Sequence, residues 1–311
     1  LPFSSSPMLE TSAEESPNLP AETAALALLP TAVTTSTDSY GILSPKAMVI
    51  VQCSSLISQL TLASLSLINA SVTMSPMAMK LCMGKLYHAR IELMKNLREA
   101  LEWAKGKGVA IGHFNISDSE GFGAVVDVAK ELKVPVIIGV SEGEREFIGI
   151  KEVVALVKVE REKGLDVFLN ADHTYSATKV KKAIDTGFDA VIIDGAEKSF
   201  EENVLMTREC VSYAKSKGGS VLVEAELGFI GQSSKILESI PEGVSQESQT
   251  KPEDAKRFID ETGVDLFAPS VGNIHGVVRS GEPSLNIERI NAIARVSGVP
   301  LVLHGASGNS D

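Results

Sequence analysis

The feature that most constrains the fold is a regular alternation of short apolar runs and amphipathic segments after residue 85. The apolar runs are rich in Val and Ile, and several amphipathic segments end in glycine directly before the next run. Such alternation is typical of a parallel sheet that is buried on both faces and covered by helices. The expected strands are VAIGHFNI (109–116), VPVIIGV (134–140), DVFLNAD (166–172), DAVIIDG (189–195), SVLVEAEL (220–227), VDLFAPSV (264–271) and VPLVLHGAS (299–307).

Polar residues stand at the carboxyl end of nearly every expected strand. An open doubly wound sheet usually has a glycine-rich phosphate turn after its first strand, and the segment GHFNISDSEG contains no such motif. Polar strand ends are instead typical of a TIM-type barrel, so we predict an α/β fold with a (β/α)8-type barrel over residues 86–311. The strand-end residues are Asn115, Ser141, Asp172, His173, Asp194, Glu224, Glu226, Asn273, His275 and His304.

The predicted barrel is one strand short. Seven strands precede the last residue, Asp311. Without the first 85 residues the chain has about 226 left, fewer than the roughly 250 typical of eight strand–helix units. We therefore expect a barrel truncated after strand 7, with two exposed sheet edges and without its closing helices.

Residues 1–85 have a different composition. The first 80 residues contain seven charged residues, one glycine and 23 serines and threonines, without a helical or strand period over the first 45. This composition predicts a low-complexity or disordered extension. The stretch 47–79 has no charge and is long enough to raise the question of a membrane span. Glutamines, an asparagine and serines interrupt it, so we favour an extension over a span.

The net charge and the spacing of the cysteines argue against several classes of function. A formal net charge of -11 and a pI of about 5.1 argue against a nucleic-acid-binding surface, which needs clustered Lys and Arg. The three cysteines Cys53, Cys82 and Cys210 are widely spaced and odd in number, so they build neither a disulfide framework nor a cysteine zinc site. A reducing, cytoplasmic location fits this pattern best.

Three of the five histidines end strands: His173, His275 and His304. A catalytic zinc ion needs three protein ligands and an open fourth position. A single strand-end histidine is more often a hydrogen-bonded loop residue. Three at the same structural position favour a metal site. His113 lies inside the first expected strand and is assigned a structural role.

The neighbouring carboxylates have two readings each. Asp172 could transfer protons beside the metal, or it could cap the helix that starts near Ser176. Glu224 and Glu226 share one face of their strand, so one could reach the metal and the other could pair with a lysine. Asp194 is either a partner of a ligand or a turn residue.

Small residues follow the two late histidines. Free backbone N–H groups at such turns suit a phosphate, although an ordinary tight turn has the same composition. These residues are Gly276, Gly305, Ala306, Ser307 and Gly308.

Taken together, the motifs resemble the class II, zinc-dependent fructose-bisphosphate aldolases, with the tagatose-bisphosphate aldolases as close relatives. The resemblance covers roughly residues 94–311. Its motifs, in the order of the family, are GHFNI, the Asp-His pair of LNADHT, VIIDGAEKSFEENV, VEAELGFIG, GNIHG and LVLHGASG.

The resemblance implies a role for each strand-end residue. His173, His275 and His304 would bind the catalytic Zn²⁺, and Asp172 would be the proton donor to the aldehyde oxygen. Glu226 and Asp194 would approach a position for a second divalent or monovalent cation. The substrate-binding residues implied are Gly276, Gly305, Ala306 and Ser307 at the phosphate, with Asn115 and Ser141 near the substrate.

The implied activity is reversible cleavage of fructose 1,6-bisphosphate to dihydroxyacetone phosphate and glyceraldehyde 3-phosphate, by a cytoplasmic homodimer or higher homo-oligomer. A Schiff-base aldolase would need a strand-end lysine, and Lys179, Lys181 and Lys182 lie in an expected helix. Three alternatives stay open. These are a tagatose-bisphosphate aldolase, a truncated copy with weak activity, and a different zinc lyase or hydrolase.

The chain departs from the family pattern in three places. Asn170 stands where the family usually has the first histidine of His-x-Asp-His. The usual Gly-Gly-x-Glu-Asp loop is replaced by GQSSKILESIPEG, in which Glu238 or Glu242 could substitute for the loop acid. The eighth strand of the family, with its phosphate motif, is missing.

Overall fold

The structure is a computed structural model that describes residues 49–53, 93–230, 236–238, 240, 247–279 and 284–305. The chain divides into two compact units, Leu1–Pro30 and Thr31–Asp311. All described residues belong to the second unit, and the fold below is that of this unit alone. Of the predicted site residues, Ala306 and Ser307 lie outside the described residues, as does Glu242.

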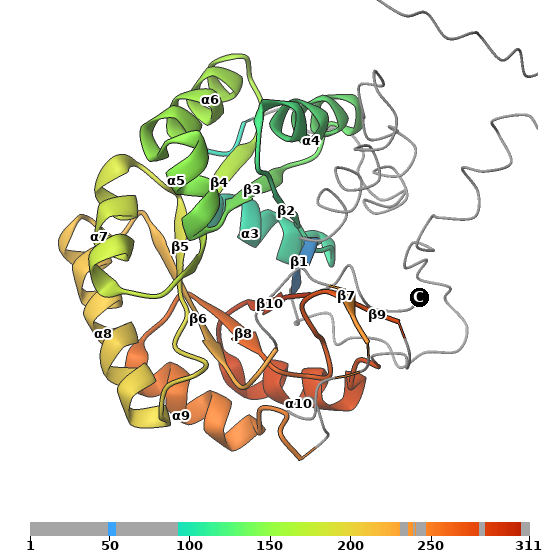
Figure 1. Cartoon of the computed structure of the whole chain (residues 1–311), viewed down its shortest axis with the longest axis vertical. Coiled ribbons are helices and arrows are strands. Elements are labelled where there is room, and N and C mark those ends of the chain that lie inside the picture. The colour runs from blue at the N-terminus through green and yellow to red at the C-terminus, as the bar shows by residue number, and fades with distance from the viewer. Residues whose placement is uncertain are drawn as a thin grey trace, which may run out of the picture. The chain divides into compact units, whose positions relative to one another are not determined.

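Eight parallel strands form a closed barrel in the order β1-β10-β8-β6-β5-β4-β3-β2 (Figure 1). The seven strands expected from the sequence are all present, which confirms the TIM-type fold class. They are β2 (Gly112–Asn115), β3 (Val136–Val140), β4 (Val167–Thr174), β5 (Ala190–Ile193), β6 (Leu222–Leu227), β8 (Leu266–Pro269) and β10 (Leu301–Leu303).

The eighth strand of the barrel comes from the N-terminal part of the chain, before the seven expected strands. β1 (Val49–Cys53) pairs in parallel with β10 on one side and with β2 on the other. β10 is the last strand of the described chain, as expected, but the two sheet edges expected beside the gap are paired. One strand of the sheet thus comes from the part of the chain before residue 85, and the boundary at this residue stays a prediction. The backbone of β1 completes the sheet, because each of its two edges meets a hydrogen-bonding edge that would otherwise be open.

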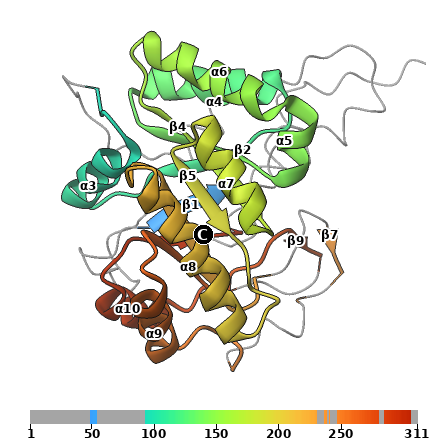
Figure 2. The same cartoon turned by 90° about the vertical axis from the view of Figure 1, so that its left-hand side faces the viewer.

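Helices surround the barrel, as two views at right angles show (Figures 1 and 2). Side chains cap several of them: Asn96, Asp118, Ser176 and Ser199 each accept a hydrogen bond from a backbone N–H of the first turn. The helices are α3 (Leu97–Lys107), α4 (Ser119–Leu132), α5 (Glu142–Ile148), α6 (Ile150–Glu162), α7 (Ala177–Thr186), α8 (Phe200–Ser216), α9 (Pro252–Thr262) and α10 (Ile287–Ser297).

The core has two parts because strand residues alternate between the two faces of the sheet. Leu169 and Ala171 face outward and pack with the surrounding helices. Phe168 faces the barrel interior, where it joins a cluster with Leu97 and Leu101 of α3. α3 therefore closes the end of the barrel at which the strands begin. The opposite end, where the strands finish, carries the polar residues.

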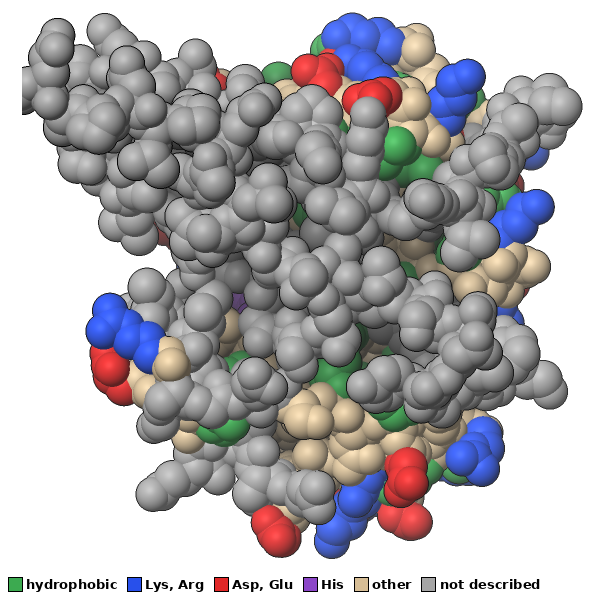
Figure 3. All heavy atoms as spheres, turned by 90° about the vertical axis from the view of Figure 1, so that its right-hand side faces the viewer, with side chains coloured by type: hydrophobic (Ala, Val, Ile, Leu, Met, Phe, Trp, Pro, Cys, Tyr) green, Lys and Arg blue, Asp and Glu red, His purple; other side chains and the backbone are tan. Residues whose placement is uncertain are grey.

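Two short strands, β7 (Ile236–Leu237) and β9 (Val277–Val278), form a separate parallel pair. Among the described residues, no helix is long and apolar enough to cross a membrane. The uncharged stretch 47–79 is described only at 49–53. On the face in Figure 3, the coloured Lys and Arg side chains lie among Asp and Glu side chains.

Candidate metal centre

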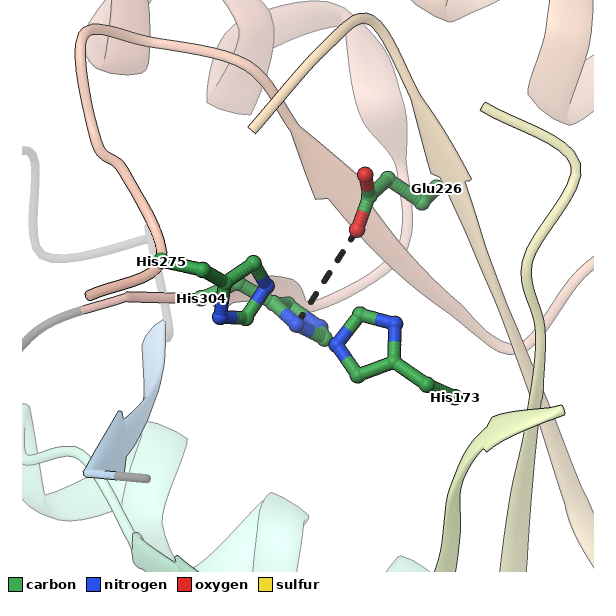
Figure 4. Close-up of side chains that lie close together, drawn as sticks. All are labelled: His173, Glu226, His275 and His304. Carbon is green, nitrogen blue, oxygen red and sulfur yellow. Dashed lines mark ion pairs between the residues drawn. The ribbon is translucent and has the colours of Figure 1, made fainter. Parts of the chain in front are cut away.

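Four side chains from four strand ends converge at the carboxyl end of the barrel. His173 is the last residue but one of β4, Glu226 lies in β6, His275 follows β8, and His304 follows β10. One ligand atom from each of them can be chosen so that all four lie within 4.8 Å of one another (Figure 4). The three histidines predicted as ligands are thus brought together, and Glu226 joins them.

The imidazoles stand edge to face around a common point. The ring centroids of His173 and His275 are 4.8 Å apart, those of His173 and His304 are 5.0 Å apart, and those of His275 and His304 are 5.4 Å apart. The interplanar angles are 74°, 76° and 82°. If these rings met only through packing, their buried nitrogens would be expected to form hydrogen bonds. Whether the nitrogens have hydrogen-bond partners therefore distinguishes simple packing from a metal site.

Each member of the cluster has one buried polar atom without a hydrogen-bond partner among the described residues. These atoms are Nε2 of His173, Nε2 of His275, Nδ1 of His304 and Oε2 of Glu226. A buried polar atom without a partner costs about 1–3 kcal/mol, and four in one place need a common explanation. A metal ion supplies it, because three imidazole nitrogens and a carboxylate are a donor set that zinc prefers. The residues present therefore fit a zinc ion.

Two carboxylates lie within hydrogen-bond distance of the second ring nitrogens of His173 and His304. Oδ2 of Asp194 lies 2.9 Å from Nδ1 of His173, and Oε1 of Glu224 lies 2.7 Å from Nε2 of His304. A carboxylate that accepts from one ring nitrogen leaves the lone pair on the other one free for a metal. Glu224 therefore pairs with a histidine and not with the lysine that the sequence suggested. Asp194 takes the role of a ligand partner in this arrangement.

Asp172 lies beside the cluster and does not cap a helix, because Ser176 accepts the capping hydrogen bond of α7. Nδ2 of Asn115 donates to Oδ2 of Asp172 at 2.8 Å. Oδ1 of Asp172 is buried and has no hydrogen-bond partner among the described residues. One oxygen is thus held in place and the other is free for chemistry.

Beneath Asp172, Nε2 of His113 lies 3.2 Å from Nδ2 of Asn170 in the barrel interior. Nδ1 of His113 and Oδ1 of Asn170 have no hydrogen-bond partners among the described residues. The structural role predicted for His113 thus involves Asn170, the residue that departs from the family pattern. Gly139 of the neighbouring strand makes room for His113 and Asn115.

Gly139→Ala is expected to lower the free energy of unfolding by roughly 1–3 kcal/mol, the cost of overpacking a core. An ideal Cβ at this position would lie 2.3 Å from Cε1 of His113 and 2.7 Å from Oδ1 of Asn115. Urea unfolding measures the change. Gly143→Ala in α5 is the matched control, since no atom lies within 4 Å of its ideal Cβ. Equal stability of the two variants would show that Gly139 is not needed for packing.

Burial and mutual charge set the protonation of the cluster. Burial lowers the pKa of His173, but Asp172, Asp194 and Glu226 raise it to about 10. Burial lowers the pKa of His304 to about 3, and burial with the neighbouring imidazoles lowers that of His275 well below its usual range.

The pKa values of the carboxylates of the site are shifted in opposite directions. Burial raises the pKa of Glu224 to about 8, and burial with the charge of Asp194 raises that of Glu226 well above its usual range. Burial also raises the pKa of Asp172, but three nearby histidines outweigh it and hold this pKa well below its usual range. Asp172 is therefore ionised at neutral pH.

Zinc affinity is expected to rise with pH. In the metal-free protein at pH 7, His173 holds a proton because its pKa is about 10, and Glu226 has a raised pKa. Ligand atoms must lose their protons to bind zinc. Binding therefore releases protons, and affinity increases about tenfold per pH unit for each proton released. Calorimetric titration with zinc in two buffers of different ionisation enthalpy counts these protons. Equal affinity at pH 6 and pH 8 would contradict the assignment.

The remaining predicted residues lie around the cluster. Ser141 forms a capping box with Glu144 at the start of α5. Gly276 and Gly305 are buried and have φ values of 100° and 65°. An ideal Cβ on Gly305 would lie 2.1 Å from the carbonyl oxygen of Ile274, so only glycine fits there.

Sequence reasoning missed one buried residue at this end of the barrel, Arg145 of α5. It is 6% exposed. Its guanidinium contacts the backbone next to His173. No pattern in the sequence marked it, because its contacts join a helix to a strand end that lies 27 residues away in the chain.

Comparisons with known proteins identify the family of the chain. Residues 95–311 match the family model described as class II fructose-bisphosphate aldolase. The chain is 40% identical over 222 residues to the fructose-bisphosphate aldolase of Geobacillus stearothermophilus, which covers 70% of this chain and 73% of that protein. It is 36% identical over 217 residues to the fructose-bisphosphate aldolase of Staphylococcus aureus, which covers 68% and 73%.

Among solved structures, the YdjI aldolase from Escherichia coli K12 is similar, with a TM-score of 0.58 and 32% sequence identity. That similarity covers 68% of this chain and 73% of the other. The resemblance seen in the motifs is thereby confirmed. The chain belongs to the class II fructose-bisphosphate aldolase family and is a carbon–carbon lyase of the aldolase class.

Proposed function

We propose that this chain is a zinc-dependent aldolase that reversibly cleaves fructose 1,6-bisphosphate to dihydroxyacetone phosphate and glyceraldehyde 3-phosphate. The observation that carries the proposal is the convergence of four ligand atoms beside Oδ1 of Asp172, all five without a hydrogen-bond partner among the described residues. The names of the curated relatives support the sugar bisphosphate as substrate.

His173, His275 and His304 would hold the zinc ion, with Glu226 as a further or alternating ligand. When bound, zinc supplies a Lewis acid that polarises the ketose carbonyl and stabilises the negative charge formed as the C3–C4 bond breaks. Asp194 and Glu224 keep the rings of His173 and His304 turned with one nitrogen toward the metal position.

Asp172 would move the proton of the reaction. Its Oδ1 has no hydrogen-bond partner among the described residues, and its low pKa keeps the carboxylate ionised, so this oxygen has room for the proton of the C4 hydroxyl during cleavage. During condensation the same oxygen returns that proton to the aldehyde oxygen. Asn115 holds Oδ2 and thereby fixes the direction in which Oδ1 points.

The phosphate would be bound at the ends of the last strands, at Gly276 and Gly305 together with Ala306 and Ser307. The two described glycines support this assignment, because they directly follow His275 and His304 in the chain and have the positive φ values of tight turns. Asn115 and Ser141 would lie near the substrate. The net charge of -11 indicates that the positive charge for phosphate binding is local rather than general.

A position for a second cation near Glu226 and Asp194 stays a prediction. The charge of Asp194 contributes to the raised pKa of Glu226, so a cation between them would relieve this repulsion. The cytoplasmic location and the homo-oligomeric state also stay predictions from the sequence.

The proposal is tested by the product of the reaction. Zinc-loaded protein is given fructose 1,6-bisphosphate or tagatose 1,6-bisphosphate, and triose phosphate formation is followed with a coupled dehydrogenase. We expect faster turnover of the fructose substrate. Faster turnover of the tagatose substrate would assign the chain to that epimer. No turnover by protein with bound zinc would indicate a catalytically weak copy, and cleavage of a non-phosphorylated ester or amide would indicate a different zinc enzyme.

A further inference from the structure

The carboxyl end of β4 departs from regular strand geometry at the metal site. Ala171 pairs with Val191 of β5, and Thr174 pairs with Ile193, so three steps along β4 match two steps along β5. One extra residue therefore bulges out of the ladder. His173 lies in this bulge with a φ of 30° and is one of two non-glycine residues with positive φ among the described residues.

The bulge explains how two consecutive residues serve one site. Leu169 and Ala171 face the surrounding helices, whereas Asn170 and Asp172 face the interior. Regular alternation would turn His173 outward, toward the helices. The extra residue turns it inward instead, next to His275 and His304. A positive φ is unfavourable for a residue with a side chain, so surrounding contacts must hold it.

The guanidinium of Arg145 makes those contacts. Nη1 donates to the carbonyl oxygens of Val140 and Asp172, the latter at 2.9 Å. Nη2 donates to Oγ1 of Thr174 at 2.9 Å. These hydrogen bonds therefore fix the residues before and after His173, Asp172 and Thr174, and connect them to Val140 at the end of β3. Arg145 is itself held in place, because α5 is a short helix fixed at its start by the capping box of Ser141.

The choice of arginine at this position calls for a reason. Arg145 is buried, and no carboxylate of the described residues forms an ion pair with it. Burial lowers its pKa, which reflects the cost of placing a charge here. A planar fork of donors is the group that can hold two carbonyls and a hydroxyl at once.

We propose that Arg145 is a positioning residue that holds the bulge at Asp172–Thr174, so that the carboxylate of Asp172 and the imidazole of His173 both face the metal. This inference rests on the proposed metal-dependent function. It assigns Arg145 no contact with substrate. It predicts that loss of the guanidinium loosens the metal site without removing any ligand.

The test is Arg145→Met, which keeps the length of the side chain and removes the donors. Zinc affinity is measured by chelator competition, and the Co²⁺-substituted protein is examined by visible absorption, both without substrate. We expect zinc affinity to fall about 10- to 100-fold, as for other groups that orient metal ligands. We also expect a changed Co²⁺ spectrum and a matching fall in kcat. Folded Arg145→Met with wild-type affinity and spectrum would overturn the proposal.

Arg161→Met is the matched control. Arg161 donates from Nε to the carbonyl oxygen of Val167 at 2.6 Å, at the opposite end of the same strand, and it pairs with Asp189. Its loss is expected to lower stability and to leave zinc affinity and the Co²⁺ spectrum unchanged. An equal loss of zinc affinity in both variants would mean that Arg145 acts only through general stability, which would also overturn the proposal.

Arg145→Lys covers the case in which the methionine variant does not fold. Lysine keeps the charge but lacks the planar set of donors that reaches all three acceptors. A zinc affinity between that of the wild type and a tenfold loss, together with an altered Co²⁺ spectrum, would support the proposal. Wild-type values for both would contradict it. Because metal binding is measured without substrate, failure of wild-type protein to cleave fructose 1,6-bisphosphate would count against the proposed function and not against the role of Arg145.

Discussion

His275→Ala is expected to weaken zinc binding by roughly 100-fold or more and to reduce aldol cleavage to a similar extent at limiting zinc. Tightly bound zinc contributes about 10–16 kcal/mol through four ligands, so one ligand accounts for roughly 3 kcal/mol. The imidazole of His275 is buried and its Nε2 has no hydrogen-bond partner among the described residues, so loss of this nitrogen breaks no hydrogen bond with them. The folded state should therefore survive the substitution.

Zinc content after dialysis and zinc affinity by chelator competition measure this effect. His88→Ala is the control, since His88 is a histidine that is not among the proposed zinc ligands. It should bind zinc like the wild type. Full zinc content in folded His275→Ala would remove this residue from the ligand set and with it the arrangement proposed for the site.

Asp172→Asn is expected to lower kcat about 100- to 1000-fold while zinc affinity changes less than about tenfold. The amide keeps the shape of the side chain and can still accept from Asn115. It cannot take up the proton that the carboxylate accepts, and positioned proton transfer contributes about 10²- to 10⁴-fold to catalysis. Single-turnover cleavage of fructose 1,6-bisphosphate by zinc-saturated protein separates this step from metal loading.

Asp118→Asn is the control for the change of charge. Asp118 caps α4 through a hydrogen bond from the N–H of Gly121, and asparagine caps helices equally well. This variant should retain its kcat. Wild-type kcat in Asp172→Asn would show that another group moves the proton, and a joint loss of zinc would show that Asp172 belongs to the metal site.

Much of the barrel could be predicted because parallel strands and helices follow a repeated pattern. The strands β2 to β6, β8 and β10 were expected near their observed positions. Because parallel strands finish at one end of a barrel, polar strand-end residues had to meet there. His173, His275 and His304 were brought together by this rule alone, although they are far apart in the chain.

β1 could not be predicted by the same reasoning. Val49–Cys53 lies inside the uncharged stretch 47–79, which its composition assigned to the extension and not to the barrel. Its position follows from the two open edges of β10 and β2, which are a property of the assembled sheet.

The partners of the site residues were also beyond the sequence. One of Glu224 and Glu226 was expected to pair with a lysine, yet Glu224 holds His304. Asp194 was expected as a partner of a ligand or as a turn residue, with a second cation near it by resemblance, and which ligand it would hold, His173, did not follow from the sequence. The bulge at His173 and its contact with Arg145 depend on the register of β4 against β5, which alternation of apolar residues does not reveal.

The most direct test of the central claim is the rate of fructose 1,6-bisphosphate cleavage before and after removal of the metal. The protein is stripped with a chelator, dialysed, and titrated with Zn²⁺ while triose phosphate formation is followed. We predict that stripping lowers the rate more than about 100-fold and that about one equivalent of zinc per chain restores it. Cleavage at an unchanged rate by protein shown to contain no metal would contradict the claim.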